Sequence, residues 1–121
     1  MCAKPCSDYQ FPAVLAADLL EGDPIVIDAR KPAAREESEL FLTGARVIDP
    51  FAFGHREAAA LSAEAGGIRP IHVFCVHGFE VSHFIAALLL VHGAKARYVP
   101  GGFEAIAAEP AMRDMLREGA G

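Results

Sequence analysis

Short aliphatic runs alternate along this chain with stretches that have helical spacing. Four runs rich in β-branched residues, each bounded by turn residues, are typical of buried parallel strands. They are 24–28, 45–48, 70–74 and 96–99. Helical spacing predicts the other elements. These are helices at 13–20, 53–65, 82–92, 103–108 and from Pro110 onward, with a short charged helix or loop at 31–37. The alternation predicts an α/β fold with a mostly parallel sheet of four to five strands and helices on both faces.

The domain organisation is predicted from the same pattern. Residues 1–12 are polar and contain two prolines, so we expect a loosely ordered N-terminal lead-in there. The segment 13–121 contains no linker, internal repeat or low-complexity stretch, and its length suits one hydrophobic core. We therefore expect a single domain over 13–121.

Charge and hydropathy limit the classes of binding partner that we expect for this protein. The net charge is −5 without any basic run, which argues against nucleic acid or an anionic membrane as a partner. The longest apolar run, Phe84 to Val91, is far shorter than the roughly 20 residues that span a bilayer. Residues 1–24 lack the pattern of a secretory signal. We expect a cytoplasmic protein, with its state as monomer or homodimer left open.

The three cysteines, Cys2, Cys6 and Cys75, do not form a disulfide framework. Cys2 and Cys6 would suit a resolving thiol for Cys75 or half of a metal site. The five histidines do not supply the spacing that zinc requires. We therefore expect neither a metal nor a cofactor, and no specific role for Cys2 and Cys6.

Cys75 is the strongest candidate for chemistry. It directly follows a predicted buried strand, and ligands of parallel sheets bind at the carboxyl ends of the strands. Its loop leads into a helix N-terminus, where inward-pointing amides form a cradle for negative charge and favour a reactive thiolate. Gly78 permits backbone angles that other residues resist, and Ser82 can cap the helix. The alternative is a buried, inert thiol.

Four segments of the chain, in this order, resemble the motifs of rhodanese domains. They are Ile25-Val26-Ile27-Asp28-Ala29-Arg30-Lys31-Pro32, Thr43-Gly44-Ala45-Arg46-Val47-Ile48, Val73-Phe74-Cys75-Val76-His77-Gly78 and Ala96-Arg97-Tyr98-Val99-Pro100-Gly101-Gly102-Phe103-Glu104. The third is similar to the active-site loop of small bacterial thiosulfate sulfurtransferases. The resemblance covers roughly residues 13–109 and implies a single rhodanese-like domain.

The resemblance also implies a sulfurtransferase mechanism. Cys75 would be the nucleophile that takes sulfur from a small sulfane donor, such as thiosulfate, as a persulfide and passes it to a thiol or protein-cysteine acceptor. A loop would bind the substrate and the persulfide. Its residues would be Val76, His77, Gly78, Phe79, Glu80 and Val81. Asp28, Arg30 and Ser82 would support the site, the first two more as an ion pair or cap that fixes the strand-to-helix turn than as catalysts.

The second half of the loop departs from the family pattern, because many rhodanese loops carry Arg there. Glu80 either repels an anionic donor or simply stabilises the first turn of a helix. Phe79 would suit an apolar or protein acceptor. His77 either tunes the thiolate or lies on the surface. Arg30 and Arg97 are the candidates for the positive charge that the loop lacks.

Two other functions remain open at this point. The first is a non-catalytic or regulatory binding module that presents the loop to a partner. The second is a thiol-based redox or oxyanion stress protein, which would need Cys2 or Cys6 as a second thiol. Phosphatase activity is disfavoured, because Val81 stands where phosphatases of this fold have the Arg that binds phosphate.

Overall fold

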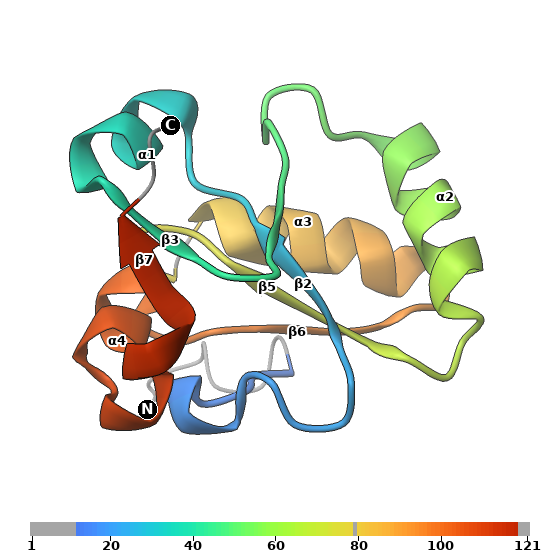
Figure 1. Ribbon diagram of the computed structural model, residues 1–121. Helices are drawn as coiled ribbons and strands as arrows, with labels where there is room; N and C mark the ends of the chain where they lie inside the picture. The colour runs from blue at the N-terminus through green and yellow to red at the C-terminus, as the bar shows by residue number, and fades with distance from the viewer. Residues whose placement is uncertain (1–11, 79, 119–121) are drawn as a thin grey trace, which may run out of the picture.

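The computed structural model describes residues 12–78 and 80–118. A parallel sheet of four strands forms the centre of the molecule (Figure 1). In spatial order the strands are β4 (Arg46–Val47), β2 (Ile25–Asp28), β5 (Pro70–Phe74) and β6 (Lys95–Tyr98). The predicted α/β fold with a parallel sheet is confirmed.

Each face of the sheet has its own hydrophobic core, because successive side chains of a strand point to opposite faces. Ile25 and Ile27 of β2 pack under the helices α2 (His55–Ala65) and α3 (Glu80–Val91). Val26, between them, faces the other core. That core contains residues of α4 (Gly102–Ala108) and of the 3₁₀ helix η3 (Pro110–Met115). Helices therefore cover both faces, as the sequence predicts.

Among residues 12–78 and 80–118, no helix is both long enough and apolar enough to cross a membrane.

The predicted helix at 13–20 is wrong for most of its length. Only Ala16–Asp18 is helical, as the 3₁₀ helix η2. Upstream, Ala13 forms a bridge with Tyr98, the Val14 amide donates to the Tyr98 carbonyl, and the Tyr98 amide donates to the Pro12 carbonyl. The chain is extended here because the edge of β6 offers unpaired backbone groups.

The predicted last helix is also corrected. Residues after Met115 form the strand β7 (Leu116–Glu118), which pairs antiparallel with β3 (Leu40–Leu42). The charged segment before β3 is helical, as α1 (Pro32–Ser38). The small β3–β7 sheet is absent from the sequence-based expectation, since three-residue strands separated by more than seventy positions carry little local signal.

The strand order defines where a ligand is expected. Within this sheet, β4 is the next strand along the chain after β2 and pairs with it on one side, and β5 pairs with β2 on the other side. The connections therefore diverge between β2 and β5, and a crevice forms at the carboxyl ends of strands at such a point. Asp28 and Phe74 are register partners at that end of the sheet.

Candidate active site

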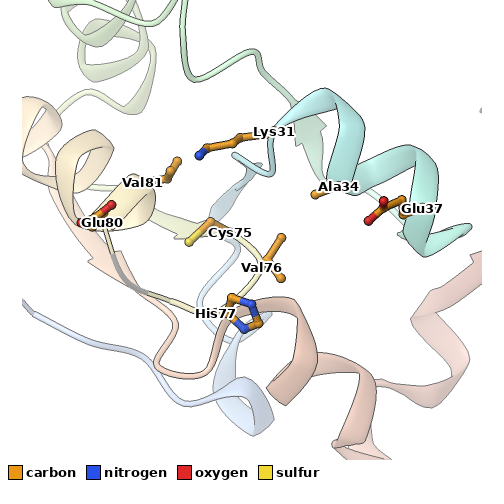
Figure 2. Close-up of a pocket in the computed structure, with 8 residues that line it drawn as sticks. All are labelled: Lys31, Ala34, Glu37, Cys75, Val76, His77, Glu80 and Val81. Atoms are coloured by element: carbon orange, nitrogen blue, oxygen red, sulfur yellow. The ribbon is translucent and has the colours of Figure 1, made fainter.

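Cys75 lies at this divergence point, as the first residue after β5. The thiol side chain is largely buried, with 6% of the residue exposed. It borders a pocket of about 720 Å³. Figure 2 shows Cys75 between α1 on one side and the first turn of α3 on the other. The residues that line the pocket come from these three segments. They are Lys31, Ala34, Glu37, Cys75, Val76, His77, Glu80 and Val81.

The hydroxyl of Ser82 is a direct neighbour of the Cys75 sulfur. Cys75 Sγ and Ser82 Oγ lie 3.3 Å apart, and Ser82 is fully buried in α3. A thiol donates to the hydroxyl oxygen in this arrangement, whereas a thiolate would accept from the hydroxyl. Ser82 can therefore adapt to the charge of the sulfur without moving. The sequence predicts Ser82 as a helix cap, but the structure places it inside α3, with its hydroxyl against the sulfur.

The start of α4 holds the first half of the Cys75 loop. The Phe103 amide donates to the Cys75 carbonyl at 2.7 Å, and the Glu104 amide donates to the Val76 carbonyl at 3.4 Å. These peptide bonds are trans, so the amide of each following residue points the opposite way. The Val76 and His77 amides therefore point away from α4.

The amides of this half-loop are available to a ligand. In the part of the chain that the structure describes, the amides of Val76, His77 and Gly78 donate no hydrogen bond to another residue. The amides of Glu80 and Val81 lie in the first turn of α3, where amides lack intrahelical acceptors. The half-loop that Cys75 opens thus keeps several amide donors for a ligand, and such donors stabilise negative charge.

Two glycines allow the loop and α4 to approach so closely. Gly78 has a φ of 78°, and a Cβ on it would lie 2.5 Å from the Val99 carbonyl oxygen. Gly102 has a φ of 59°, and a Cβ on it would lie 2.5 Å from the Val76 carbonyl oxygen. Both positions require positive φ and no side chain. The Gly-Gly-Phe turn and the Cys75 loop are therefore one packed unit.

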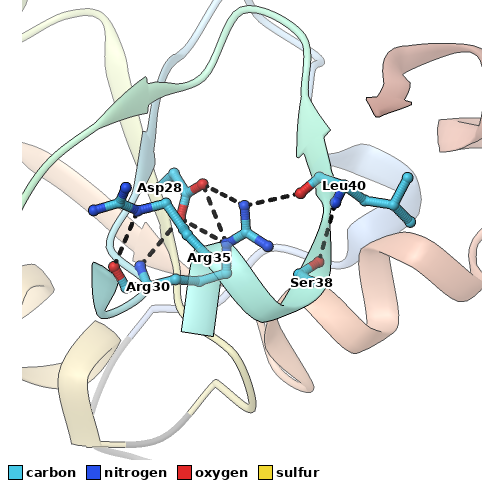
Figure 3. Close-up of polar contacts among 5 residues, drawn as sticks. All are labelled: Asp28, Arg30, Arg35, Ser38 and Leu40. Carbon is cyan, nitrogen blue, oxygen red and sulfur yellow. Dashed lines mark hydrogen bonds and ion pairs between the residues drawn. The ribbon is translucent and has the colours of Figure 1, made fainter. Parts of the chain in front are cut away.

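Asp28 and Arg30 form a buried ion pair next to this unit (Figure 3). Arg30 donates from Nε to Asp28 Oδ1 at 3.0 Å and from Nη2 to Asp28 Oδ2 at 2.8 Å. Nη2 also donates to the Leu40 carbonyl, and the guanidinium lies 4.0 Å from the centre of the Phe103 ring. The pair does not line the pocket. It connects β2, β3 and α4, which is the structural role that the sequence analysis favoured.

The positive charge at the pocket comes from Lys31, which sequence reasoning missed. Arg30 is engaged with Asp28, and Arg97 borders a different pocket that includes His72. Lys31 precedes α1 and its amine lies 5.8 Å from the centre of the Phe51 ring. Its position shortly after the end of β2, separated from Asp28 by Ala29 and Arg30, is the signal that could have found it.

Three predicted loop residues need correction or lie outside the description. Glu80 and Val81 belong to the first turn of α3 rather than to the loop. This position agrees with the alternative in which the Glu80 carboxylate stabilises the first turn of a helix. Both still line the pocket. Phe79 lies outside the described residues. His77 is exposed at the pocket, with Nδ1 3.3 Å from Glu104 Oε1.

No metal centre is found in residues 12–78 and 80–118, where no group of three potential ligands occurs. Cys2 and Cys6, like the rest of the predicted lead-in up to residue 11, lie outside the described residues. Cys75 is a free cysteine.

Comparison with known proteins reveals similar structures and no similar curated sequences. No protein-family model matches the chain, and no curated protein matches it. An As-Sb reductase from Leishmania major superposes with a TM-score of 0.72 at 16% identity, covering 92% of this chain and 88% of that one. A rhodanese-related protein from Thermoplasma volcanium has a TM-score of 0.61 at 22% identity, covering 83% of this chain and 94% of the other.

A third similar structure is much longer. The reduced CoADR-RHD of Bacillus anthracis superposes with a TM-score of 0.64 at 20% identity over 90% of this chain. The chain spans only 18% of that protein's length. At these identities the likeness establishes the fold, and the activity has to be argued from the chemistry of the site.

Proposed function

We propose that this chain, a rhodanese-like domain by its fold, is a sulfurtransferase that carries sulfane sulfur as a persulfide on Cys75. One observation carries the proposal. The Cys75 residue borders an open pocket at the carboxyl end of β5, its sulfur contacts the Ser82 hydroxyl, and it opens a loop whose backbone amides have no acceptor among the described residues. A nucleophile surrounded by preorganised donors is suited to a reaction that places a second negative sulfur at the same point.

The first half-reaction is a nucleophilic displacement. The Cys75 thiolate attacks the outer sulfur of a donor, a new S–S bond forms on Cys75, and the bond between that sulfur and the rest of the donor breaks. The bonding electrons leave with the donor remnant, which is sulfite for thiosulfate and a thiolate for a persulfide. In the second half-reaction, an acceptor nucleophile attacks the outer sulfur and Cys75 leaves as a thiolate. No external oxidant or reductant is needed.

The loop residues act on the charge of the persulfide. The amides of Val76, His77 and Gly78 bind its terminal sulfur, and Ser82 donates to whichever Cys75 sulfur carries charge. Removing one such donor from a preorganised site typically reduces a rate by about 10²–10³-fold. These interactions are stronger for the anion than for a neutral thiol, so they favour transfer over simple binding.

Intact-mass measurement tests the proposal directly. The protein is incubated with thiosulfate and, separately, with a persulfide donor, and its mass is recorded before and after addition of cyanide. We expect a gain of one sulfur atom that cyanide removes and that Cys75→Ser abolishes. A folded protein whose Cys75 reacts with iodoacetamide but gains no sulfur from any donor would overturn the proposal and favour a binding module.

Oxyanion reduction is a second candidate, and its support is the similarity to the As-Sb reductase. Reduction of arsenate to arsenite takes two electrons, which two thiols supply by forming a disulfide. Cys75 would need Cys2, Cys6 or an external thiol as its partner. The assay is arsenite production with glutathione present. Cys2→Ser and Cys6→Ser together would abolish reduction that uses the internal thiols, whereas sulfur loading of Cys75 would be unchanged.

A further inference from the structure

We infer that the pocket selects a zwitterionic amino-acid persulfide as the sulfur donor, with Lys31 binding its carboxylate and Glu80 its ammonium group. The inference rests on the proposed function and names the substrate class of the same site. It comes from the charges that surround Cys75, which do not suit a compact dianion such as thiosulfate.

Lys31 is the single lysine or arginine that lines the pocket in the described part of the chain. It is exposed, and its contact with the Phe51 ring is the one interaction of its amine among the described residues. Figure 2 shows its amine directed across the pocket toward Val81, the neighbour of Glu80 in α3. One lysine amine binds one carboxylate as a point charge.

Two carboxylates line the same pocket, and they outnumber the lysine. Glu37 belongs to α1 and Glu80 to the first turn of α3. A donor with two negative charges would gain one attraction and meet two repulsions. A donor with adjacent carboxylate and ammonium groups would meet an opposite charge at each.

Glu80 suits the ammonium group better than Glu37 does. Lys31 and Glu37 are six positions apart along one helical segment, which corresponds to roughly 9 Å of helix rise. This separation exceeds the distance between the charged groups of one α-amino acid. Glu80, in contrast, lies in the first turn of α3, one residue before Val81, toward which the Lys31 amine is directed (Figure 2). A ligand in this pocket whose carboxylate binds the Lys31 amine would therefore have its ammonium group near the first turn of α3, where Glu80 lies.

The transfer from such a donor is balanced. The Cys75 thiolate attacks the terminal sulfur of the amino-acid persulfide, forms the new S–S bond, and expels the amino-acid thiolate with the electrons of the broken S–S bond. The terminal proton stays with the transferred sulfur or is lost to solvent. The product is a zwitterionic thiol that leaves the pocket.

Four persulfide donors of similar size separate the two charges. Cysteine persulfide carries both, the persulfide of 3-mercaptopropionate carries only the carboxylate, that of cysteamine only the ammonium group, and that of 2-mercaptoethanol neither. Loading of Cys75 is measured by rapid quenching and intact mass. The donors differ in intrinsic leaving ability, so each rate is expressed as the ratio of parent to variant protein, which cancels that difference.

We expect Lys31→Gln to slow loading from the two carboxylate-bearing donors by about three- to tenfold and to leave the other two unchanged. Glu80→Gln should slow the two ammonium-bearing donors by a similar factor and should accelerate loading from thiosulfate. Lys95→Gln on β6 and Glu36→Gln on α1 are matched controls, because both residues are exposed and neither lines the pocket. Both control variants should take sulfur from every donor at the rate of the parent protein.

The outcomes distinguish the two proposals. If all four donors load Cys75 and both variants load as fast as the parent protein, the substrate inference is wrong and the sulfurtransferase proposal stands. If Cys75 takes sulfur from no donor, the proposed function fails. An effect of Lys31→Gln on all four donors alike would also overturn the inference, since it would indicate a general effect on the thiolate.

Discussion

The two sides of the Cys75 loop are held in opposite ways. Toward α4 the loop is fixed by backbone hydrogen bonds and by glycines whose positions leave no room for a side chain. Toward α1 and α3 it faces exposed, charged side chains across an open pocket. The packed side fixes the direction of the loop amides, so substitutions at its glycines would change that direction. The open side carries charges that can be altered one at a time without disturbing the fold.

The packed side depends on the buried Asp28–Arg30 pair, and a second Arg–carboxylate pair provides the comparison. Arg46 and Glu64 also form a pair, but at the surface between β4 and α2. Arg30→Met leaves the Asp28 carboxylate buried without its partner and should lower the free energy of unfolding by about 3–5 kcal/mol. Chemical denaturation measures this change. Sulfur loading should fall with it, because Phe103 loses its contact with the guanidinium.

Arg46→Met is the matched control. Its pair with Glu64 is solvated, so the denaturation midpoint and the sulfur loading should stay close to those of the parent protein. Equal destabilisation by the two substitutions would contradict the view that the buried pair organises the packed side.

Gly102→Ala attacks the contact between α4 and the loop itself. The new Cβ would meet the Cys75 and Val76 carbonyls, and alanine would have to adopt positive φ. We expect a loss of about 2–4 kcal/mol in unfolding free energy and near-complete loss of sulfur loading in the protein that remains folded. Intact mass with a persulfide donor, at a temperature well below the unfolding midpoint, measures the latter.

Gly67→Ala separates the strain from the clash. Gly67 has a φ of 74° with no atom within 4 Å of the position of a Cβ. Its substitution should cost only about 1 kcal/mol and leave loading unchanged. If both glycine variants load sulfur normally, the tight approach of α4 is not what orients the loop.

Ser82→Ala tests the buried hydroxyl that α3 places against the Cys75 sulfur. It removes the hydroxyl that lies 3.3 Å from the Cys75 sulfur. We expect loading to fall roughly tenfold or more, with a change of about 1 kcal/mol in stability. Ser62→Ala in α2 is the control, since Ser62 is buried and its hydroxyl has no hydrogen-bond partner among the described residues. A loading rate unaffected by Ser82→Ala would exclude the hydroxyl from the chemistry.

Sequence patterns were sufficient to predict the packed centre of the fold. The runs around Ile27, Val73 and Ala96 predicted the parallel strands, because burial on both faces selects continuous aliphatic residues. The same logic predicted the place of Cys75. The pairing of Leu42 with Leu116 escaped prediction, because antiparallel contact between distant three-residue segments depends on tertiary packing.

The charged wall of the pocket was harder to predict. Lys31 and Glu37 have the pattern of solvated residues of a short helix, and only the position of α1, between β2 and β3, brings them to the pocket of Cys75. Arg30 and Arg97 were better candidates by charge alone, yet one is buried in an ion pair and the other borders a separate pocket. Local patterns predict which residues are charged, whereas only the assembled chain shows which charges share a cavity.

The smallest effect we predict comes from His72, a buried residue of β5. Burial lowers the pKa of His72 below 6.5, although its hydrogen bond with the Leu19 carbonyl, 2.7 Å from Nδ1, opposes the shift. The unfolded chain therefore binds a proton below about pH 6.5 that the folded protein does not, so stability decreases as the pH falls from 6.5 toward the folded pKa. The slope contributed by one histidine is at most about 1.4 kcal/mol per pH unit.

Denaturation midpoints measure this contribution. They are recorded for the parent protein and for His72→Asn between about pH 7.5 and 5, the range in which a histidine titrates. Asparagine keeps a donor for the Leu19 carbonyl and removes the titration, so the variant's stability should vary less with pH. Some dependence should persist, since burial also lowers the pKa of His83. Parallel curves for the two proteins would show that His72 is not the group that couples protonation to folding on this side of the sheet.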